Sequence, residues 1–226
     1  MYKLVCFDLD GTLVDNIVFS WQLFHEYFKT DSKKREKVKA KFYNGEISYL
    51  EWARHDINMW VAKNAKKKDF MDALKKNNVK LMKGARETLN ILKNKGMKLA
   101  IVSGSLNIIL EYVLPDYKDY FDDVYLSWIH FDKIGNVTEV KVTEYDMNKK
   151  ADALRRIAAE QKIALKECVF IGDHHNDLKI AELAGFSIAF DAKDEDLRKV
   201  ADVCVDKKNL KEVLQYILPS DVKHIS

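Results

Sequence analysis

Residues 6–14 read CFDLDGTLV, an apolar run that ends in two carboxylates one residue apart, Asp8 and Asp10. Residues i and i+2 of a strand point to the same side, so both acids can face one pocket at a strand end, where Gly11 lets the backbone turn away. An Asp-Gly hairpin turn is the alternative interpretation of the same letters. It is disfavoured because helical patterning, and no partner strand, follows.

From residue 79 onward, helical and strand patterns alternate along the chain. Residues 84–96 have helical apolar spacing and end in glycine, and residues 97–105, MKLAIVSGS, form an apolar run that ends in small polar residues. The same pattern, a helical segment followed by an apolar run, recurs three times and ends in strand-like runs at residues 167–173, 186–192 and 202–206. This alternation predicts an α/β fold, a doubly wound parallel sheet with helices on both faces.

Two segments depart from the alternation. Residues 15–78 contain several helical stretches and no convincing strand, which predicts an all-helical domain inserted into a core made of residues 1–14 and 79–226. Residues 121–145 contain a Gly-Asn turn between two strand-like runs. They predict a short hairpin at the edge of the sheet.

Composition limits the partners and the compartment. The formal net charge is only +3, so the overall charge does not call for a nucleic acid partner. The three cysteines, Cys6, Cys168 and Cys204, each lie in a short apolar run and form no CxxC pair, which indicates buried thiols in a reducing compartment. No uninterrupted apolar stretch approaches the ~18 residues of a membrane span. We therefore expect a cytoplasmic protein without a membrane partner.

A second group of acids follows another apolar run, in CVFIGDHHNDLK. Asp173 comes directly after the run and Asp177 four residues later, at a helix start, where it could serve only as an N-cap. A calcium-binding loop is excluded, because its sixth position is Leu178 instead of glycine and its twelfth is Ala184 instead of glutamate.

The two groups of acids are expected to meet. Ligands of open parallel sheets bind beyond the carboxyl ends of the strands, and every one of these acids lies at such an end. Asp8, Asp10 and Asp173 together would form a strongly negative, oxygen-rich site, which is favourable only when it holds a cation such as Mg²⁺.

Phosphate-binding parts occur elsewhere in the sequence. Ser103, in IVSGS, offers a hydroxyl followed by backbone N–H groups, although serine and glycine also end strands for turn reasons alone. Lys149 and Lys150 supply a cation to balance a phosphate dianion, although lysines near a helix start are usually surface residues. The set predicts phosphoryl transfer in which Asp8 attacks phosphorus and Asp10 protonates the leaving oxygen, then deprotonates water.

The sequence resembles the haloacid dehalogenase superfamily of phosphohydrolases, and within it the phosphoserine phosphatase-like branch with a helical cap inserted after the first strand. DLDGT, residues 8–12, is similar to the family's DxDxT motif and IVSGS, residues 101–105, to its serine motif. Lys150 matches its lysine, and GDHHND, residues 172–177, its acidic motif. The resemblance covers nearly the whole chain and implies a Rossmann-like core with residues 15–78 as the cap.

The resemblance also implies a role for each matching residue. Asp8 would be the nucleophile and Asp10 the acid and base, with Ser103 and Lys150 completing the catalytic set. Mg²⁺ would be held by Asp8, Asp10 and Asp173, with support from Asp177. The substrate-binding residues that it implies are Thr12, Arg54, Ser103, Gly104, Lys150 and Asn176.

Two features depart from phosphoserine phosphatases, one at Ile17 and one at His174 and His175. The two histidines stand between Gly-Asp and Asn-Asp, where small residues are usual, and we interpret them as loop histidines without a ligand in preference to metal ligands or pocket residues. Ile17 stands where those enzymes typically have a glutamate that binds the substrate's amino group, whereas Arg54 matches the cap arginine that holds the substrate carboxylate. The predicted function is a Mg²⁺-dependent phosphatase that hydrolyses a small phosphomonoester through an aspartyl-phosphate, as a monomer or homodimer. Phosphoserine phosphatase proper, a phosphotransferase and a catalytically silent phosphate-binding protein remain alternatives.

Overall fold

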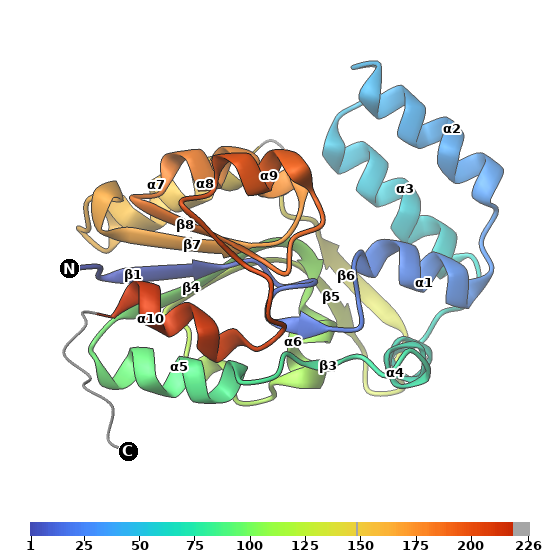
Figure 1. Cartoon of the computed structure of the whole chain (residues 1–226). Helices are drawn as coiled ribbons and strands as arrows, with labels where there is room; N and C mark the ends of the chain where they lie inside the picture. The colour runs from blue at the N-terminus through green and yellow to red at the C-terminus, as the bar shows by residue number, and fades with distance from the viewer. Residues whose placement is uncertain (148, 219–226) are drawn as a thin grey trace.

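The computed structural model describes residues 1–147 and 149–218, so residue 148 and the last eight residues of the predicted core range 79–226 lie outside the described residues. The core is a seven-stranded sheet in the order β6-β5-β4-β1-β7-β8-β9 (Figure 1). Its strands are β1 Leu4–Phe7, β4 Lys98–Leu106, β5 Asp123–Phe131, β6 Val137–Lys141, β7 Cys168–Gly172, β8 Phe186–Phe190 and β9 Val203–Val205. All neighbours are parallel except β5 and β6.

Helices cover both faces of this sheet, as the sequence predicted (Figure 1). Alternate residues of β1 separate into two apolar layers: Leu4 and Cys6 belong to one, Val5 and Phe7 to the other. The first layer is covered by α7 Lys150–Glu160, α8 Leu178–Leu183 and α9 Glu195–Val200, the second by α5 Ala85–Asn94, α6 Asn107–Val113 and α10 Leu214–Ile217. A strand buried on both faces requires the continuous apolar run seen in the sequence.

Short 3₁₀ helices and a hairpin complete the core. The 3₁₀ helices are η1 Tyr117–Asp119, η2 Leu165–Glu167, η3 His175–Asp177 and η4 Leu210–Val213. Strands β5 and β6 pair antiparallel at the sheet edge, which confirms the predicted hairpin. The hairpin tip reaches the inserted helices, because the Lys67 N–H donates to the carbonyl of Gly135 at 2.8 Å.

Four helices form the inserted segment beside the carboxyl end of the sheet (Figure 1). They are α1 Ser20–Phe28, α2 Ser32–Tyr43, α3 Tyr49–Val61 and α4 Lys67–Lys76. Phe24, Trp60 and Phe70 pack edge to face at their centre, with ring centroids 4.9–5.8 Å apart. These buried aromatic rings account for part of the aromatic content of the insert.

A two-stranded ribbon connects the insert to the core. Strand β2, Val14–Asp15, pairs antiparallel with β3, Lys80–Leu81. The chain therefore does form a short strand after the loop at Gly11, contrary to the expectation from the sequence. A strand of two residues is too short to produce a periodic pattern, so neither β2 nor β3 could be distinguished from the neighbouring helical pattern.

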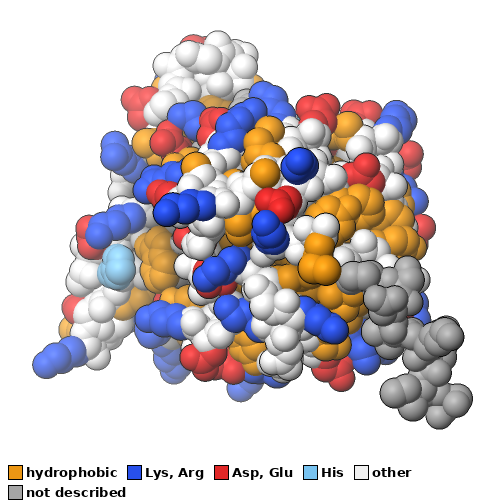
Figure 2. Space-filling model, turned by 90° about the vertical axis from the view of Figure 1, so that its left-hand side faces the viewer, with side chains coloured by type: hydrophobic (Ala, Val, Ile, Leu, Met, Phe, Trp, Pro, Cys, Tyr) orange, Lys and Arg blue, Asp and Glu red, His pale blue; other side chains and the backbone are white. Residues whose placement is uncertain are grey.

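The charged surface and the length of the helices indicate which partners the chain could bind. Figure 2 shows lysine and arginine side chains interspersed with acidic ones over the face at the amino ends of the strands. Within residues 1–147 and 149–218, no helix is long and apolar enough to cross a membrane.

Candidate active site

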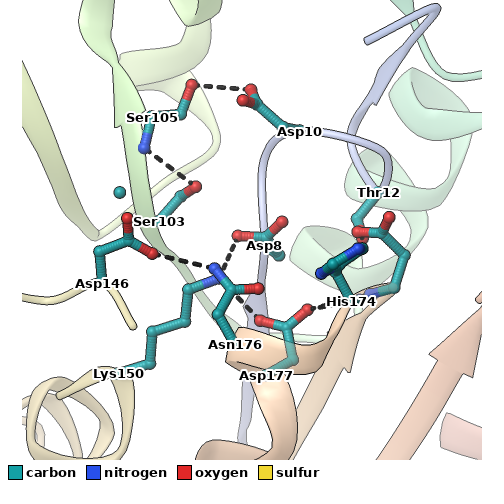
Figure 3. A network of polar contacts seen from close by, with 12 residues as sticks. Asp8, Asp10, Thr12, Ser103, Ser105, Asp146, Lys150, His174, Asn176 and Asp177 are labelled. Atoms are coloured by element: carbon teal, nitrogen blue, oxygen red, sulfur yellow. Dashed lines mark hydrogen bonds and ion pairs between the residues drawn. The ribbon is translucent and has the colours of Figure 1, made fainter. Parts of the chain in front are cut away.

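The acids of the first motif and of the last meet at the carboxyl edge of the sheet (Figure 3). Asp8 follows β1 directly, and its N–H continues the ladder by donating to the Ile171 carbonyl of β7 at 2.9 Å. Asp173 follows β7, and Ser103 lies in β4 on the other side of β1. Adjacent parallel strands therefore bring together Asp8 and Asp173, which are 165 positions apart in the sequence.

Lys150, the first residue of α7, lies at the centre of this group. Its side chain is only 1% exposed, and its Nζ lies 2.6 Å from Oδ1 of Asp8 and 2.7 Å from Oδ1 of Asp177. Burial alone would lower the pKa of Lys150, but Asp177 and Asp8 raise it above its usual value. The lysine is therefore a fixed positive charge, whereas the neighbouring Lys149 is exposed and pairs with Glu144.

Three carboxylates surround a point beside this lysine. One oxygen each of Asp8, Asp173 and Asp177 lies within 4.8 Å of the others. Thr12 orients Asp173 by donating its hydroxyl to Oδ1 at 3.1 Å. Gly11, with φ of +81°, makes room for this carboxylate, because a Cβ there would lie 2.2 Å from Oδ2 of Asp173.

Asp177 differs from Asp8 and Asp173 in its contacts. Both oxygens of Asp177 already have protein partners: Oδ1 binds Lys150, and Oδ2 accepts the N–H groups of Asp173 and His174 at 3.0 and 3.2 Å. Asp177 thus holds the loop and the lysine in place. Asp8 and Asp173 keep oxygen atoms facing the same space.

Electrostatics favour a cation in this space. Burial raises the pKa of Asp8, and Lys150 offsets the rise only in part. Burial, followed by repulsion from Asp8 and Asp177, also raises the pKa of Asp173. One lysine cannot neutralise three carboxylates, so the donor set fits a divalent cation with oxygen ligands, of which Mg²⁺ is one.

Asp10 points toward Ser105 and away from Lys150 (Figure 3). Its Oδ1 accepts the hydroxyl of Ser105 at 2.7 Å, and its Oδ2 accepts the backbone N–H of Ser20, the first residue of α1, at 2.8 Å. Burial raises the pKa of Asp10 to about 6, although both serine contacts lower it. A carboxyl with such a pKa can carry a proton near neutral pH and exchange it.

The phosphate-binding residues that the sequence predicted lie beside Asp8 and Lys150. The Oγ of Ser103 is buried and accepts the N–H of Ser105 at 3.3 Å. The carbonyl of Gly104 accepts the indole N–H of Trp21 at 3.0 Å, which ties cap to core. Asn176 reaches the same region and donates its side-chain amide to Asp146 at 2.9 Å.

A cavity of about 540 Å³ lies between core and cap, and it borders this region at Asn176 and Asp146, although Asp8 and Lys150 do not line it. Its floor includes Asp146, His174 and Asn176 of the core. The cap side is rich in aromatic and charged residues: Phe19, Trp21, Gln22, Arg35, Lys39, Tyr43, Tyr49, Trp52, Ala53 and Asp56. Several aromatic rings of the insert therefore line a cavity instead of filling its core.

Arg54 is not brought to this cavity. It is exposed on α3, whereas Tyr49, Ala53 and Asp56 of the same helix line the cavity. Those three lie at i, i+4 and i+7 on one helical face, and position 54 falls off it. The arginine that the structure does place on the cavity wall is Arg35 of α2, whose Nε donates to Asp56 at 3.0 Å.

Several residues of the site were not predicted from the sequence. Ser105 follows Ser103 by two positions on β4, and that strand spacing was the available signal. Ser20 and Tyr49 come from the cap, and Asp146 comes from the segment before α7. No local pattern marks these three, because their contacts depend on how cap and core meet.

Comparisons with known proteins agree with this geometry. A family model for haloacid dehalogenase-like hydrolases matches residues 2–185. A phosphoserine phosphatase of Methanocaldococcus jannaschii is 30% identical over 216 residues, covering 95% of this chain and 97% of that protein. The resemblance predicted from the motifs is confirmed.

Solved structures of similar proteins share the fold. A substrate-bound phosphoserine phosphatase superimposes with a TM-score of 0.73 at 26% identity, over 96% of this chain and 99% of the other. A phospho-aspartyl intermediate analogue of phosphoserine phosphatase gives a TM-score of 0.72 at 27% identity, with the same coverage. The chain belongs to the haloacid dehalogenase-like hydrolases, in the group of that family whose named members include phosphoserine phosphatases.

Proposed function

We propose that this hydrolase is a Mg²⁺-dependent phosphatase that hydrolyses a small phosphomonoester through an aspartyl-phosphate on Asp8. One observation carries the proposal: Lys150 is buried between Asp8 and Asp177, with Asp10 nearby at a pKa of about 6. This pairs an ionised nucleophile, which a fixed cation supports, with a neighbour that can exchange a proton. The similarity to a phosphoserine phosphatase solved as a phospho-aspartyl intermediate analogue supports the same chemistry.

The metal fits the carboxylates already described. Asp8 and Asp173 would hold Mg²⁺, with the backbone at Asp10 completing the protein ligands and Asp177 supporting them from behind. When bound, the ion neutralises charge on the phosphoryl group and lowers its repulsion of Asp8. Thr12 would contribute by orienting Asp173, to which its hydroxyl donates at 3.1 Å.

The chain's own groups account for both chemical steps. In the first, an Asp8 oxygen forms a bond to phosphorus, the ester P–O bond breaks, and Asp10 gives its proton to the leaving oxygen. In the second, Asp10 takes a proton from water, whose oxygen attacks phosphorus and frees Asp8 and inorganic phosphate. Ser103, Gly104, Lys150 and Asn176 would hold the phosphoryl oxygens throughout.

The leaving group would occupy the cavity under the cap. The cap consists of residues 15–78. Phosphoserine is the substrate named for the relatives, and it is the second candidate. Ile17 is buried and apolar and offers no partner for an ammonium group, and Arg54 lies outside the cavity. The aromatic lining at Trp21 and Trp52 favours an alcohol with a larger, flatter apolar part than serine.

The test is phosphate release from a panel of monoesters that includes phosphoserine and aryl esters, with Mg²⁺ or with EDTA. We expect release that requires Mg²⁺ and is abolished in Asp8→Asn, while Asp152→Asn, an exposed aspartate of α7, behaves as the wild type. Added alcohols that accept the phosphoryl group would instead indicate a phosphotransferase. If folded wild-type protein binds phosphate but releases none from any ester, the chain is a phosphate-binding protein and our proposal is wrong.

A further inference from the structure

Asp146 stands where core, cap and cavity meet. It lies in the turn that leads into α7, where its carbonyl accepts the N–H of Lys149 at 3.0 Å. Its Oδ1 accepts the amide of Asn176 from the core at 2.9 Å (Figure 3). Its Oδ2 accepts the hydroxyl of Tyr49 from the cap, also at 2.9 Å. No step of the proposed reaction uses this carboxylate.

The carboxylate also rests directly against the backbone of Gly104. A Cβ on Gly104 would lie 2.0 Å from both Cγ and Oδ2 of Asp146, so only glycine permits this approach. Asp146 further helps raise the pKa of Lys150, after Asp177 and Asp8. An anion therefore sits among Gly104, Lys150 and Asn176, the groups to which the proposed function assigns the substrate phosphate.

We propose that the Asp146 carboxylate is an internal anion that occupies the phosphate subsite in the ligand-free enzyme and must leave it when a phosphate group binds. The inference rests on the proposed function, since it concerns the same subsite. A carboxylate and a phosphate dianion repel each other and compete for the same donors, so they cannot share the space between Gly104 and Asn176.

Displacement has two effects on ligand binding. The exchange costs the ligand part of its binding free energy, so Asp146 sets the affinity for every phosphate-bearing ligand, product included. It also breaks the Tyr49 hydrogen bond, a polar contact between α3 and the core, so phosphate entry loosens the cap at that point. Asp146 is thus a residue that tunes affinity and does not touch the reacting bonds.

The experiment compares Asp146→Asn and Asp146→Ala with the wild type by calorimetric titration of the Mg²⁺-loaded proteins with inorganic phosphate. Asp152→Asn is the matched control, because it removes an equal charge from the first turn of α7 at an exposed position. We expect at least tenfold tighter phosphate binding in both Asp146 variants, and no change in the control. With a monoester substrate, KM should fall by a similar factor while kcat does not rise.

The outcomes separate this inference from the proposed function. Unchanged or weaker phosphate binding in both variants overturns the inference, including the case in which Asp146 instead holds a cationic part of the substrate and KM rises. Tighter phosphate binding in the variants, without ester hydrolysis by the wild type, leaves the inference standing and overturns the phosphatase proposal alone. Melting curves of each variant verify that the proteins compared are folded.

Discussion

The Nζ atom of Lys150 lies 2.6 Å from Oδ1 of Asp8, and the lysine side chain is almost completely buried. Breaking a buried ion pair by removing one partner is costly, because the other charge remains without compensation. In this site two carboxylates would lose their cation, since Asp177 binds the same nitrogen at 2.7 Å. The ion pair between Lys150 and Asp8 therefore contributes to both the stability of the protein and its activity.

Replacing this lysine should harm both properties. Lys150→Ala leaves Asp8 and Asp177 buried without a cation, so we expect about 3–5 kcal/mol lower free energy of unfolding and loss of ester hydrolysis. Urea unfolding and a phosphate-release assay measure the two effects. Lys149→Ala, the exposed neighbour, should change stability by less than about 0.5 kcal/mol. Equal effects of the two substitutions would contradict the assigned geometry.

The Ser105 hydroxyl should set the pH range of the reaction. Its hydrogen bond stabilises the ionised form of Asp10 and lowers the pKa of that carboxyl. In Ser105→Ala the pKa rises, so the protonated acid persists to higher pH, and the alkaline limb of the kcat profile should move up by about one unit. Ser127→Ala, at a buried serine of β5, serves as the control. A shift to lower pH would refute the role of Asp10 as the acid.

Asp173 should destabilise the metal-free protein at neutral pH. Its pKa in the folded state is raised above the ordinary value of 3.8. The contribution of Asp173 to the free energy of unfolding is therefore highest below pH 3.8, where the carboxyl is protonated in both states, and it decreases as pH rises toward the pKa of the folded state. In EDTA at pH 8 we expect Asp173→Asn to melt at a higher temperature than the wild type. At pH 4 the difference should shrink.

Added Mg²⁺ should reverse that order. A ligand at 100 times its Kd stabilises the folded state by about 2.7 kcal/mol, which corresponds to a Tm rise of about 5–10 °C for a chain of this size. Scanning calorimetry should find this rise in the wild type and little of it in Asp173→Asn. A similar rise in both proteins would place the ion elsewhere.

Two arginines of the cap should differ in their effect on the substrate. Arg35 lines the cavity and pairs with Asp56, whereas Arg54 is exposed outside it. Arg35→Met should therefore change KM for the preferred ester several-fold, and Arg54→Ala should leave KM and kcat unchanged. Steady-state kinetics on both variants decide the point. A raised KM in Arg54→Ala alone would restore the assignment made from the sequence.

The parts that could be predicted from the sequence are those fixed by local pattern. Val5 and Phe7 belong to an apolar run buried on both faces, and such runs followed by acids mark the strand ends where Asp8 and Asp173 meet. The choice of Lys150 over Lys149 followed from the family motif, and the structure buries that lysine. These features depend on the few residues around them.

The parts that could not be predicted depend on how distant segments meet. The phase of α3 decides whether Arg54 or Asp56 faces the cavity, and that phase is fixed by packing against α1 and α2. Ser20 meets Asp10 only because α1 returns to the core, and Asp146 reaches Gly104 only because its turn folds over β4. Strands β2 and β3 were missed because two residues carry no period.

The ribbon of β2 and β3 limits how the cap can move. Both chain crossings between core and cap run through Val14–Asp15 and Lys80–Leu81, which are hydrogen-bonded to each other. Two tethers joined side by side leave essentially one soft degree of freedom, a rotation about the ribbon, and oppose sliding or twisting. A small rotation about the ribbon would be enlarged over the length of α2 and α3, so the mouth of the cavity would move further than Val14 does.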